Sequence, residues 1–505
     1  MIKTRHTAVF VVFCTLSIGS VAQRSTGETP LTFDEALQMM LTNSEVIKQS
    51  ELHSLQMNEE KKAVRNLRLP QVSLNANYIM LSEDISIDLH EIRDAITPLY
   101  GALSNYGVFA GIPNPDPATN EMLPFLPQEI STPLVREQLA EGLQSIENAN
   151  WNKVIQKRQF GTLSAAMQWP LYAGGKIEAA NKAAEIRFKE AQFAEAQKNG
   201  ALYTQLVERY FGLALATKAA AVREEVLSAM EAHLQDASKL FEEGLIPRAE
   251  LLHAQVFHAQ ADRELREARR QLQIVSEGLT NTLAVEQEKS FCPTTALFYQ
   301  KQIESVDFFK QSALSTNPIL SQVTAKKELA RQGTKAEFAG LLPVVAAFGN
   351  YNLANIDLSP NISDYMVGVT LSWKLFGGTS SRNKVKSARL VEAQVDEAHQ
   401  KAARDIETGI EKYHQELKMA LEQLEELETA WEFANEYDRI RKQAFHEGMA
   451  TSTEVVDASL ALAKVRIERL QAIYRYDVAL AKLLELAGIP QQFLGYQTGA
   501  VTINN

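Results

Sequence analysis

This chain contains an internal repeat, and self-similarity at a fixed distance marks an architecture built from copies of one unit. Three short segments occur twice, in the same order. They are Leu69-Pro70 and Leu342-Pro343, residues 169–174 and 373–378, and residues 241–245 and 445–449. The positions in the first pair differ by 273, and those in the other two pairs differ by 204. The chain therefore consists of two related halves.

The two offsets indicate where the halves differ in length. Because the second and third pairs share one offset, the segment between them has the same length in both halves. The offsets themselves differ by 69, so the first half is longer between its first two motifs, and we expect a long loop there, at about 82–152. Loops of that length inside a compact unit are usually functional or mobile. We expect a first repeat at 23–285, a connector at 286–308, a second repeat at 309–488 and a C-terminal tail at 489–505.

Four segments beside the motifs alternate between apolar and polar residues, which is the pattern of a β-strand with two different faces. We expect strands at about 70–81, 160–172, 343–353 and 365–376. In the last one, Val367, Val369 and Leu371 share one face. A soluble sandwich is the alternative, although only four such strands are expected in a chain that is otherwise helical. Four strands cannot close a barrel, and open strand edges are not tolerated in hydrocarbon. If the strands enter a membrane, several chains must pool them, with Trp169 and Trp373 at the membrane interface.

The rest of the chain is rich in good helix formers and has few helix breakers. From residue 175 to about 241 runs one helical pattern, which corresponds to roughly 100 Å at about 1.5 Å per residue. The helix before the first strand, at about 33–66, and the helix at about 247–282 each have about half that length. We therefore expect each repeat to place one continuous helix beside two half-length helices stacked end to end, as in the wall of a tube.

The N-terminus has the features of an export signal. Lys3 and Arg5 precede an apolar run, and small residues follow at 20–22. We expect residues 1–22 to be a signal peptide; a membrane anchor is the alternative, but the run is shorter than the roughly 20 residues that a spanning helix needs. The formal net charge of −11 does not favour nucleic acid as a partner. Cys292 is the one cysteine after the signal, so we expect no internal disulfide.

Taken together, the motifs resemble those of the TolC-type outer-membrane efflux proteins, the exit ducts of tripartite efflux and type I secretion systems. The resemblance covers nearly all of the chain after residue 22 and includes the start of the first helix at 31–37, the Leu-Pro motifs and both glycine-containing turns. It implies a mainly α-helical fold with a transmembrane β-barrel portion. In that fold a homotrimer closes one barrel from three sets of four strands, in contact with outer-membrane lipid, and a periplasmic α-helical barrel continues it. It also implies two partners, a periplasmic adaptor and an inner-membrane pump.

The resemblance assigns a role to both glycine-containing turns. In the family the corresponding helix tips face the adaptor, so Gly244, Leu245, Gly448 and Met449 are the expected adaptor contacts. Glycine suits the left-handed conformation that ends a helix, and the apolar residue after it can pack against a neighbour. A plain turn with no partner is the alternative.

The family's pore narrows at the periplasmic tip, where acidic residues form rings across the trimer. The corresponding positions are Glu454 and Asp457, one helical turn apart on one face, and Glu250 occupies the matching place in the first half. Such rings favour cations and raise the pKa values of their members; an ordinary solvated helix face is the alternative. The Tyr and Arg that hold the entrance shut in the family's best-known member are Phe445 and Ala450 here, so the same hydrogen-bonded lock cannot form. Closure would then use either apolar packing or the acidic rings, and our hypothesis is closure by Phe445.

The sequence contains none of the catalytic or metal-binding motifs that we considered. The nine His residues are scattered, and neither a His-Glu-x-x-His nor a Cys-x-x-Cys spacing occurs. The Gly pairs at 174–175 and 377–378 lack the remaining glycines of a phosphate loop. We therefore expect no enzyme activity, no metal site and no cofactor. The duct is expected to conduct passively, with the energy for export supplied by the inner-membrane pump. Two alternatives stay open: a periplasmic coiled-coil adaptor or structural protein, and a general diffusion porin.

Overall fold

The computed structural model describes residues 29–285, 290–498 and 500–502. The expected signal peptide at 1–22 lies outside these residues, as do parts of the expected connector and tail. The chain forms two compact units. Unit 1 comprises the described residues of 1–61, 183–331 and 389–505, and unit 2 comprises residues 62–182 and 332–388.

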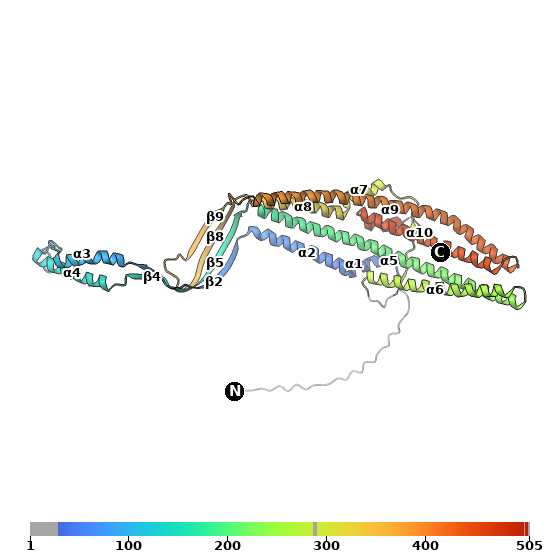
Figure 1. Ribbon diagram of the computed structural model, residues 1–505, viewed down its shortest axis with the longest axis horizontal. Coiled ribbons are helices and arrows are strands. Elements are labelled where there is room, and N and C mark those ends of the chain that lie inside the picture. The colour runs from blue at the N-terminus through green and yellow to red at the C-terminus, as the bar shows by residue number, and fades with distance from the viewer. Residues whose placement is uncertain (1–28, 286–289, 499, 503–505) are drawn as a thin grey trace, which may run out of the picture. The chain divides into compact units, whose positions relative to one another are not determined.

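The long helices of the two halves have equal lengths (Figure 1). α5 (Lys176–Glu242) and α9 (Ser380–His446) each contain 67 residues, and α6 (Arg248–Thr282) and α10 (Ser452–Leu486) each contain 35. Both helices of the second half begin and end 204 residues after their counterparts in the first half, which is the offset of the second and third motif pairs. The equal spacing of the sequence motifs therefore reflects helices that begin and end at equivalent residues.

The helix expected at about 33–66 is interrupted. α1 (Phe33–Asn43) ends at Ser44, and α2 (Glu45–Arg65) and the 3-10 turn η1 (Asn66–Arg68) follow. Ser44 leaves the helical conformation, and its hydroxyl accepts a hydrogen bond from the Ile47 amide at 3.5 Å. Ser and Asn side chains compete with the helical backbone in this way and favour helix ends.

The second half has the same break 273 residues further along the chain, which is the offset of the first motif pair. α7 (Val306–Thr316) and α8 (Pro318–Ala339) meet at Asn317, whose Oδ1 accepts hydrogen bonds from the Ile319 and Leu320 amides at 2.8 and 3.2 Å. Pro318 then occupies the first helical position, where its missing N–H costs nothing. The half-length helix that precedes the first long strand is thus split in both repeats, whereas α6 and α10 are continuous.

Unit 2 contains a four-stranded antiparallel sheet in the order β2-β5-β8-β9. The strands are β2 (Gln71–Met80), β5 (Gln159–Tyr172), β8 (Val344–Ile356) and β9 (Tyr365–Ser372). The register brings Leu74, Ala165, Tyr351 and Tyr365 into one row across all four strands. Asn75, Ser164 and Asn352 form a row on the opposite face. The sheet therefore has one apolar and one polar face, as the alternation predicts.

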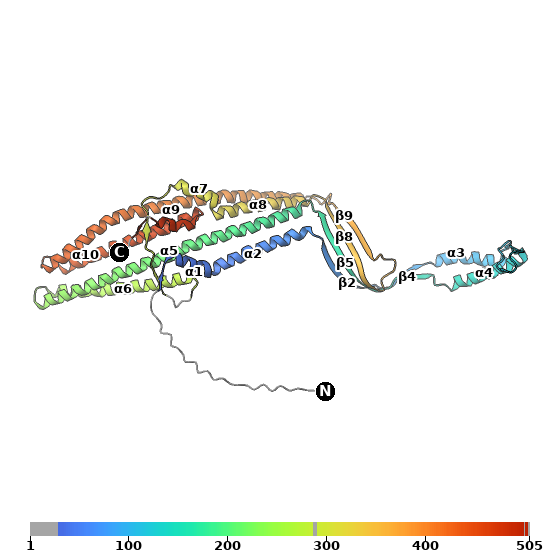
Figure 2. The same ribbon diagram turned by 180° about the vertical axis from the view of Figure 1, so that it is seen from behind.

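The segment expected as a long loop is an ordered insertion within unit 2. It contains β3 (Ile85–Asp88), α3 (His90–Tyr106), α4 (Gln128–Asn148) and β4 (Asn152–Gln156). β3 and β4 pair as an antiparallel ribbon, and α3 lies beside α4 in both views (Figures 1 and 2). Short paired strands therefore occur in addition to the four expected strands, both here and in unit 1.

The core of unit 1 joins segments that are far apart in sequence. β1 (Thr29–Leu31) pairs in parallel with β6 (Phe291–Pro293), and β7 (Phe298–Tyr299) pairs with β10 (Val501–Thr502). After α10 the chain continues through η2 (Pro490–Gln492) and α11 (Phe493–Gln497). Phe33, Phe211, Phe298 and Phe493 bury their rings against one another, with centroids 5.3 to 6.1 Å apart. The described parts of the connector and tail are therefore packed against the long helices.

None of the helices in the described part of the chain combines the length and apolar character needed to cross a membrane.

Candidate functional site

The turns at Gly244 and Gly448 have the same hydrogen-bonded geometry. Gly244 has φ of 74°, its amide donates to the Phe241 carbonyl at 2.9 Å, and the next amide donates to the Leu240 carbonyl at 2.8 Å. Gly448 has φ of 73°, with the equivalent bonds to Phe445 and Ala444 at 2.9 and 2.8 Å. This is the Schellman motif, in which a left-handed residue lets two amides satisfy the last carbonyls of a helix. Both turns are built at the same place in each repeat.

The residues that follow these glycines point into solvent. Leu245 is 67% exposed and Met449 is 71% exposed. In a Schellman motif the apolar residue at this position usually packs back onto its own helix. Here neither does, so each tip carries an apolar side chain that is available to a partner.

Glu454 caps its own helix. Its carboxylate accepts hydrogen bonds from the Thr451 amide at 2.8 Å, the Thr451 hydroxyl caps the Glu454 amide, and Arg441 forms an ion pair with Glu454 at 3.2 Å. The Thr451 amide, with help from Arg441, lowers the pKa of Glu454. That direction is opposite to the expectation for a ring of carboxylates alone, so the contacts within one chain keep Glu454 ionised.

Asp457 and Glu250 differ from Glu454 in their surroundings. Asp457 is exposed, three residues further along α10. Glu250 reaches across to the second repeat, where its carboxylate accepts a hydrogen bond from the Ser452 amide at 3.1 Å. A carboxylate at that position stabilises the N-terminus of α10, whose first amides have no partner within the helix. Glu250 therefore joins the two helical hairpins near their tips.

Phe445 is buried in the chain, at 6% exposure. Its ring packs against the ring of His233 on α5, with centroids 4.7 Å apart. His233 also hydrogen bonds to the Ser452 hydroxyl, and burial lowers its pKa despite the opposing effect of Asp236 and Glu250. Within one chain, Phe445 thus holds the two hairpins together and does not project from the surface. The spacing of the motifs gave no indication of His233 or Ser452, because their meeting depends on how the hairpins pack.

Trp169 and Trp373 occupy equivalent positions in unit 2. The Trp169 indole N–H donates to the carbonyl of Arg68 at 3.0 Å, and the Trp373 indole donates to the carbonyl of Leu341 at 3.1 Å. Their exposed fractions are 42% and 54%. Each indole therefore joins the end of one strand to the residue just before the Leu-Pro motif that opens another, while its apolar ring stays exposed.

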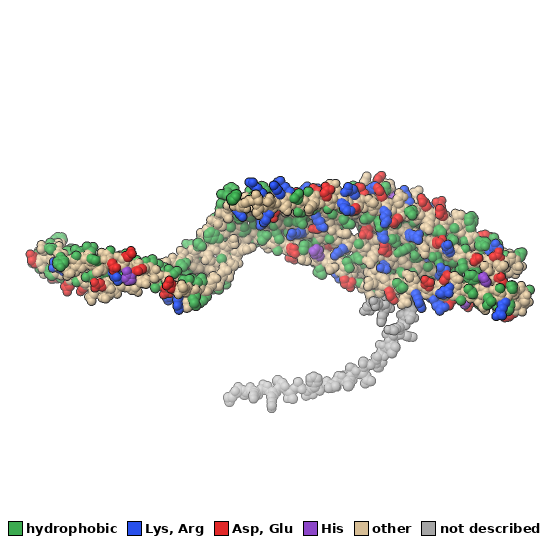
Figure 3. Space-filling model, viewed as in Figure 1, with side chains coloured by type: hydrophobic (Ala, Val, Ile, Leu, Met, Phe, Trp, Pro, Cys, Tyr) green, Lys and Arg blue, Asp and Glu red, His purple; other side chains and the backbone are tan. Residues whose placement is uncertain are grey.

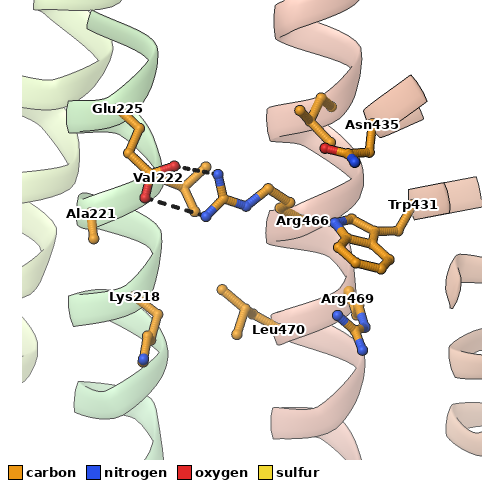
Figure 4. A pocket seen from close by; sticks show the side chains of 10 residues that line it. Lys218, Ala221, Val222, Glu225, Trp431, Asn435, Arg466, Arg469 and Leu470 are labelled. Atoms are coloured by element: carbon orange, nitrogen blue, oxygen red, sulfur yellow. Dashed lines mark hydrogen bonds and ion pairs between the residues drawn. The ribbon is translucent and has the colours of Figure 1, made fainter. Parts of the chain in front are cut away.

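A cavity of about 410 Å³ lies between α5, α9 and α10 in unit 1 (Figure 4). Three basic residues, Lys218, Arg466 and Arg469, line it beside Trp431. Arg466 forms a two-pronged ion pair with Glu225, and Arg469 pairs with Glu428 at 2.6 Å while lying over the Trp431 ring. Both guanidinium groups are thus engaged within the wall of helices. Among the described residues, no group of His, Cys, Asp or Glu side chains is placed to hold a metal ion.

The two equivalent hairpins and the matched turns correspond to a known sequence family. A family model described as outer membrane efflux protein matches residues 144–285 and 310–489, which is more than half of the chain and falls in both repeats. The chain belongs to the outer membrane efflux protein family. It is therefore an exit duct of an efflux system and resides in the outer membrane. Family membership selects this function over the coiled-coil adaptor and the diffusion porin.

Solved structures share the fold of this outer membrane efflux protein at low sequence identity. A membrane protein from Pseudomonas aeruginosa superposes with a TM-score of 0.69 at 14% identity, over 90% of each chain. The outer membrane protein VceC from Vibrio cholerae gives 0.67 at 13% identity, over 90% of this chain and 96% of that one. The CmeC outer membrane channel of Campylobacter jejuni gives 0.67 at 12% identity, over 96% and 94%. Comparison with curated protein sequences gives no match.

Proposed function

We propose that this efflux duct is a homotrimer in which three four-stranded sheets close one barrel through the outer membrane. The observation that carries the proposal is the open sheet of unit 2, whose edge strands β2 and β9 each have a neighbour on one side only. Val72, Val367 and Val369 on its apolar face are 66 to 72% exposed. Unpaired strand edges are costly in hydrocarbon, so the strands of neighbouring chains must pair with them.

The α5/α6 and α9/α10 hairpins of the three chains then form the wall of a periplasmic tube. Helices of 67 residues extend roughly 100 Å. Cargo passes through this tube passively, since transport needs no catalytic centre in the duct itself. The energy comes from an inner-membrane pump, which a periplasmic adaptor joins to the duct.

The adaptor binds the tips of both hairpins. Gly244 and Gly448 allow the turns, and the exposed side chains of Leu245 and Met449 supply apolar contacts. Apolar side chains that protrude from a rigid turn are suited to binding, because little conformational freedom is lost on association.

The entrance is lined by carboxylates of Glu454 and Asp457 from three chains, with Glu250 set behind them as a link between hairpins. Closure uses apolar packing at Phe445, which holds α9 against α5 through His233. Opening requires the hairpins of each chain to separate at this contact.

The trimer is tested by measuring the native mass of the duct extracted from outer membranes and its conductance in planar lipid bilayers. We expect three copies of the 56.2 kDa chain, less any removed signal, and cation-selective channels. A monomer that conducts, or an extract without channel activity, contradicts the proposal.

Adaptor contact is tested by cross-linking from single cysteines in a Cys292→Ser background. Met449→Cys should cross-link to the adaptor encoded with its pump. Met419→Cys is the matched control, since Met419 is similarly exposed, at 65%, but lies far from the tip on α9. Equal cross-linking from both positions would refute the assignment of the tip.

Closure at Phe445 is tested by single-channel recording. Phe445→Ala should lower the time spent closed, whereas Phe433→Ala, which removes a ring that is 71% exposed on the same helix, should not. Unchanged closure in the Phe445 variant would show that the contact with His233 does not hold the entrance.

A further inference from the structure

The insertion in the first repeat buries very little within its own chain. α3 has no buried residue, and α4 buries only Ser131. The helices pack through one side, where the Tyr100 ring lies against Gly142 and Leu143 approaches Gly101. Two helices alone cannot enclose a core, so apolar residues on their other sides stay in contact with water.

The exposed apolar residues of α3 form one stripe. Its members are Ile92, Ala95, Leu99, Ala102 and Tyr106, all of them exposed. Ile92, Leu99 and Tyr106 are 50, 58 and 81% exposed. The spacing alternates between three and four residues, which is the heptad pattern of a helix that packs along a seam with other helices. The stripe contains no charged residue, although Arg93 and Asp94 lie beside it.

The distal end of the insertion is ordered and also exposes apolar side chains (Figure 3). The Gly111 amide donates to the Leu126 carbonyl at 3.2 Å, and the buried Asn114 side chain donates to the Leu123 carbonyl at 3.1 Å. Met122 is nevertheless 94% exposed. This end is therefore held in shape by its own hydrogen bonds while presenting apolar groups to solvent.

The base of the insertion is fixed to the second repeat. The buried Gln156 side chain donates to the Asp357 carbonyl at 2.8 Å and accepts from the Ser359 amide at 2.7 Å. Lys157 forms an ion pair with Asp357 at 2.5 Å. These contacts join β4 to the turn between β8 and β9, at the end of the sheet away from the Leu-Pro motifs, so the direction in which the insertion leaves the sheet is defined.

We propose that the insertions of three copies of this chain associate through the α3 stripe and form a helical cap at the outer end of the duct. The inference rests on the proposed trimer. Threefold symmetry places three identical α3 helices in parallel around one axis, and a stripe with heptad spacing and no charge is complementary to itself in that arrangement. The α4 helices, whose outer residues Glu137, Glu141 and Gln144 are polar and exposed, face solvent.

Another copy fits the stripe better than lipid does. The charged side chains of Glu91, Arg93 and Asp94 flank the stripe on the same helix, and burying them in hydrocarbon would be costly. In a helical seam the same side chains stay at the edge in water.

The cap is tested by cysteine cross-linking of the full-length duct in outer membranes, in a Cys292→Ser background. Leu99→Cys should form covalent dimers with a short bismaleimide in most chains, because two of the three thiols at a threefold axis can be joined. Gln144→Cys on the outer side of α4 is the matched control and should stay monomeric under denaturing conditions. The native mass of the sample before cross-linking is measured in parallel.

The outcomes separate the two proposals. A trimer that cross-links at Leu99→Cys and not at Gln144→Cys supports the cap. A trimer in which Leu99→Cys fails to cross-link, or in which both positions cross-link equally, overturns the cap and leaves the proposed function intact. A monomer overturns the proposed function itself.

A charge in the seam provides a second measurement. Leu99→Asp leaves the hairpin contact between α3 and α4 unchanged, since Leu99 is 58% exposed, but sets three carboxylates against one another at the axis. We expect Tyr106→Cys to cross-link between chains when it is the only other change, and this cross-linking to be lost in the Leu99→Asp/Tyr106→Cys double variant. Unchanged cross-linking at Tyr106→Cys would show that the stripe is not the contact.

Discussion

Asp477 on α10 is the carboxyl group whose environment should most strongly affect stability. It is 0% exposed, and neither of its side-chain oxygens has a hydrogen-bond partner of normal geometry among the described residues. Burial raises the pKa of Asp477 well above its ordinary value of 3.8, and the nearby Phe298 amide opposes this only in part. The group is therefore protonated in the folded duct over a range of pH in which it is ionised in the unfolded chain. Asp477→Asn keeps the shape of the side chain and removes this difference.

The sign and size of the effect follow from proton linkage. Because the pKa is raised on folding, the folded state binds the extra proton. The stabilisation it provides is fully present below pH 3.8 and is lost as pH rises toward the folded pKa. Within that window the free energy of unfolding falls by about 1.4 kcal/mol per pH unit for each chain. Asn binds no proton, so the variant lacks this slope and becomes the more stable form as pH increases.

The assay is thermal unfolding of the purified duct, followed by tryptophan fluorescence across a pH series. We expect the Tm of Asp477→Asn to exceed that of the parent by a margin that widens from acidic toward neutral pH. Glu51→Gln, at an exposed position on α2, is the matched control and should track the parent. If the Tm of Asp477→Asn and the Tm of the parent changed with pH in parallel, the Asp477 carboxyl would not bind an extra proton in the folded state.

Three further sets of substitutions test local features of the structure. Thr451→Ala removes the cap of α10 and should cost about 1 kcal/mol, seen as a lower Tm and faster amide exchange in the first turn of α10. Gly448→Ala forces a side chain into a conformation with φ of 73° and should destabilise the turn by about 1–2 kcal/mol. Gly333→Ala, in the interior of α8 with open space around it, should instead stabilise the helix by about 0.5–1 kcal/mol, and equal effects at both glycines would refute the role of φ. Gln156→Ala leaves the Ser359 amide without its partner and should cost about 1–3 kcal/mol; unchanged amide exchange there would show that the insertion is not clamped.

The repeat was sufficient to predict the main architecture. Two motif pairs with a common offset predicted equal helices, and α5 and α9 have the same length of 67 residues. The period-two pattern placed the four long strands, because a sheet with two different faces imposes that pattern directly. Both features are local in sequence, and the family match confirms the fold class.

The missed features depend on contacts between distant segments or on single capping residues. The breaks at Ser44 and Asn317 fall inside helical patterns and are marked only by one polar side chain each. β1 and β6 have three residues apiece and pair across about half of the chain, so no local pattern reveals them. The burial of Phe445 against His233 depends on how the two hairpins pack, which the spacing of motifs does not contain.

The equal helices also restrict how this chain can change during evolution. Deleting one residue from α9 would shorten it by about 1.5 Å and rotate every side chain beyond the deletion by about 100°. The turn at Gly448 would lose its alignment with the turn at Gly244. The side chains of Met449, Glu454 and Asp457 would then face new directions. An insertion between β2 and β5 displaces none of these groups, because the strands on either side of it are held by their own pairing. Changes in length can therefore accumulate in the segment between β2 and β5, where a lineage can add parts suited to its surroundings, while the two helical hairpins vary in residue type at constant length.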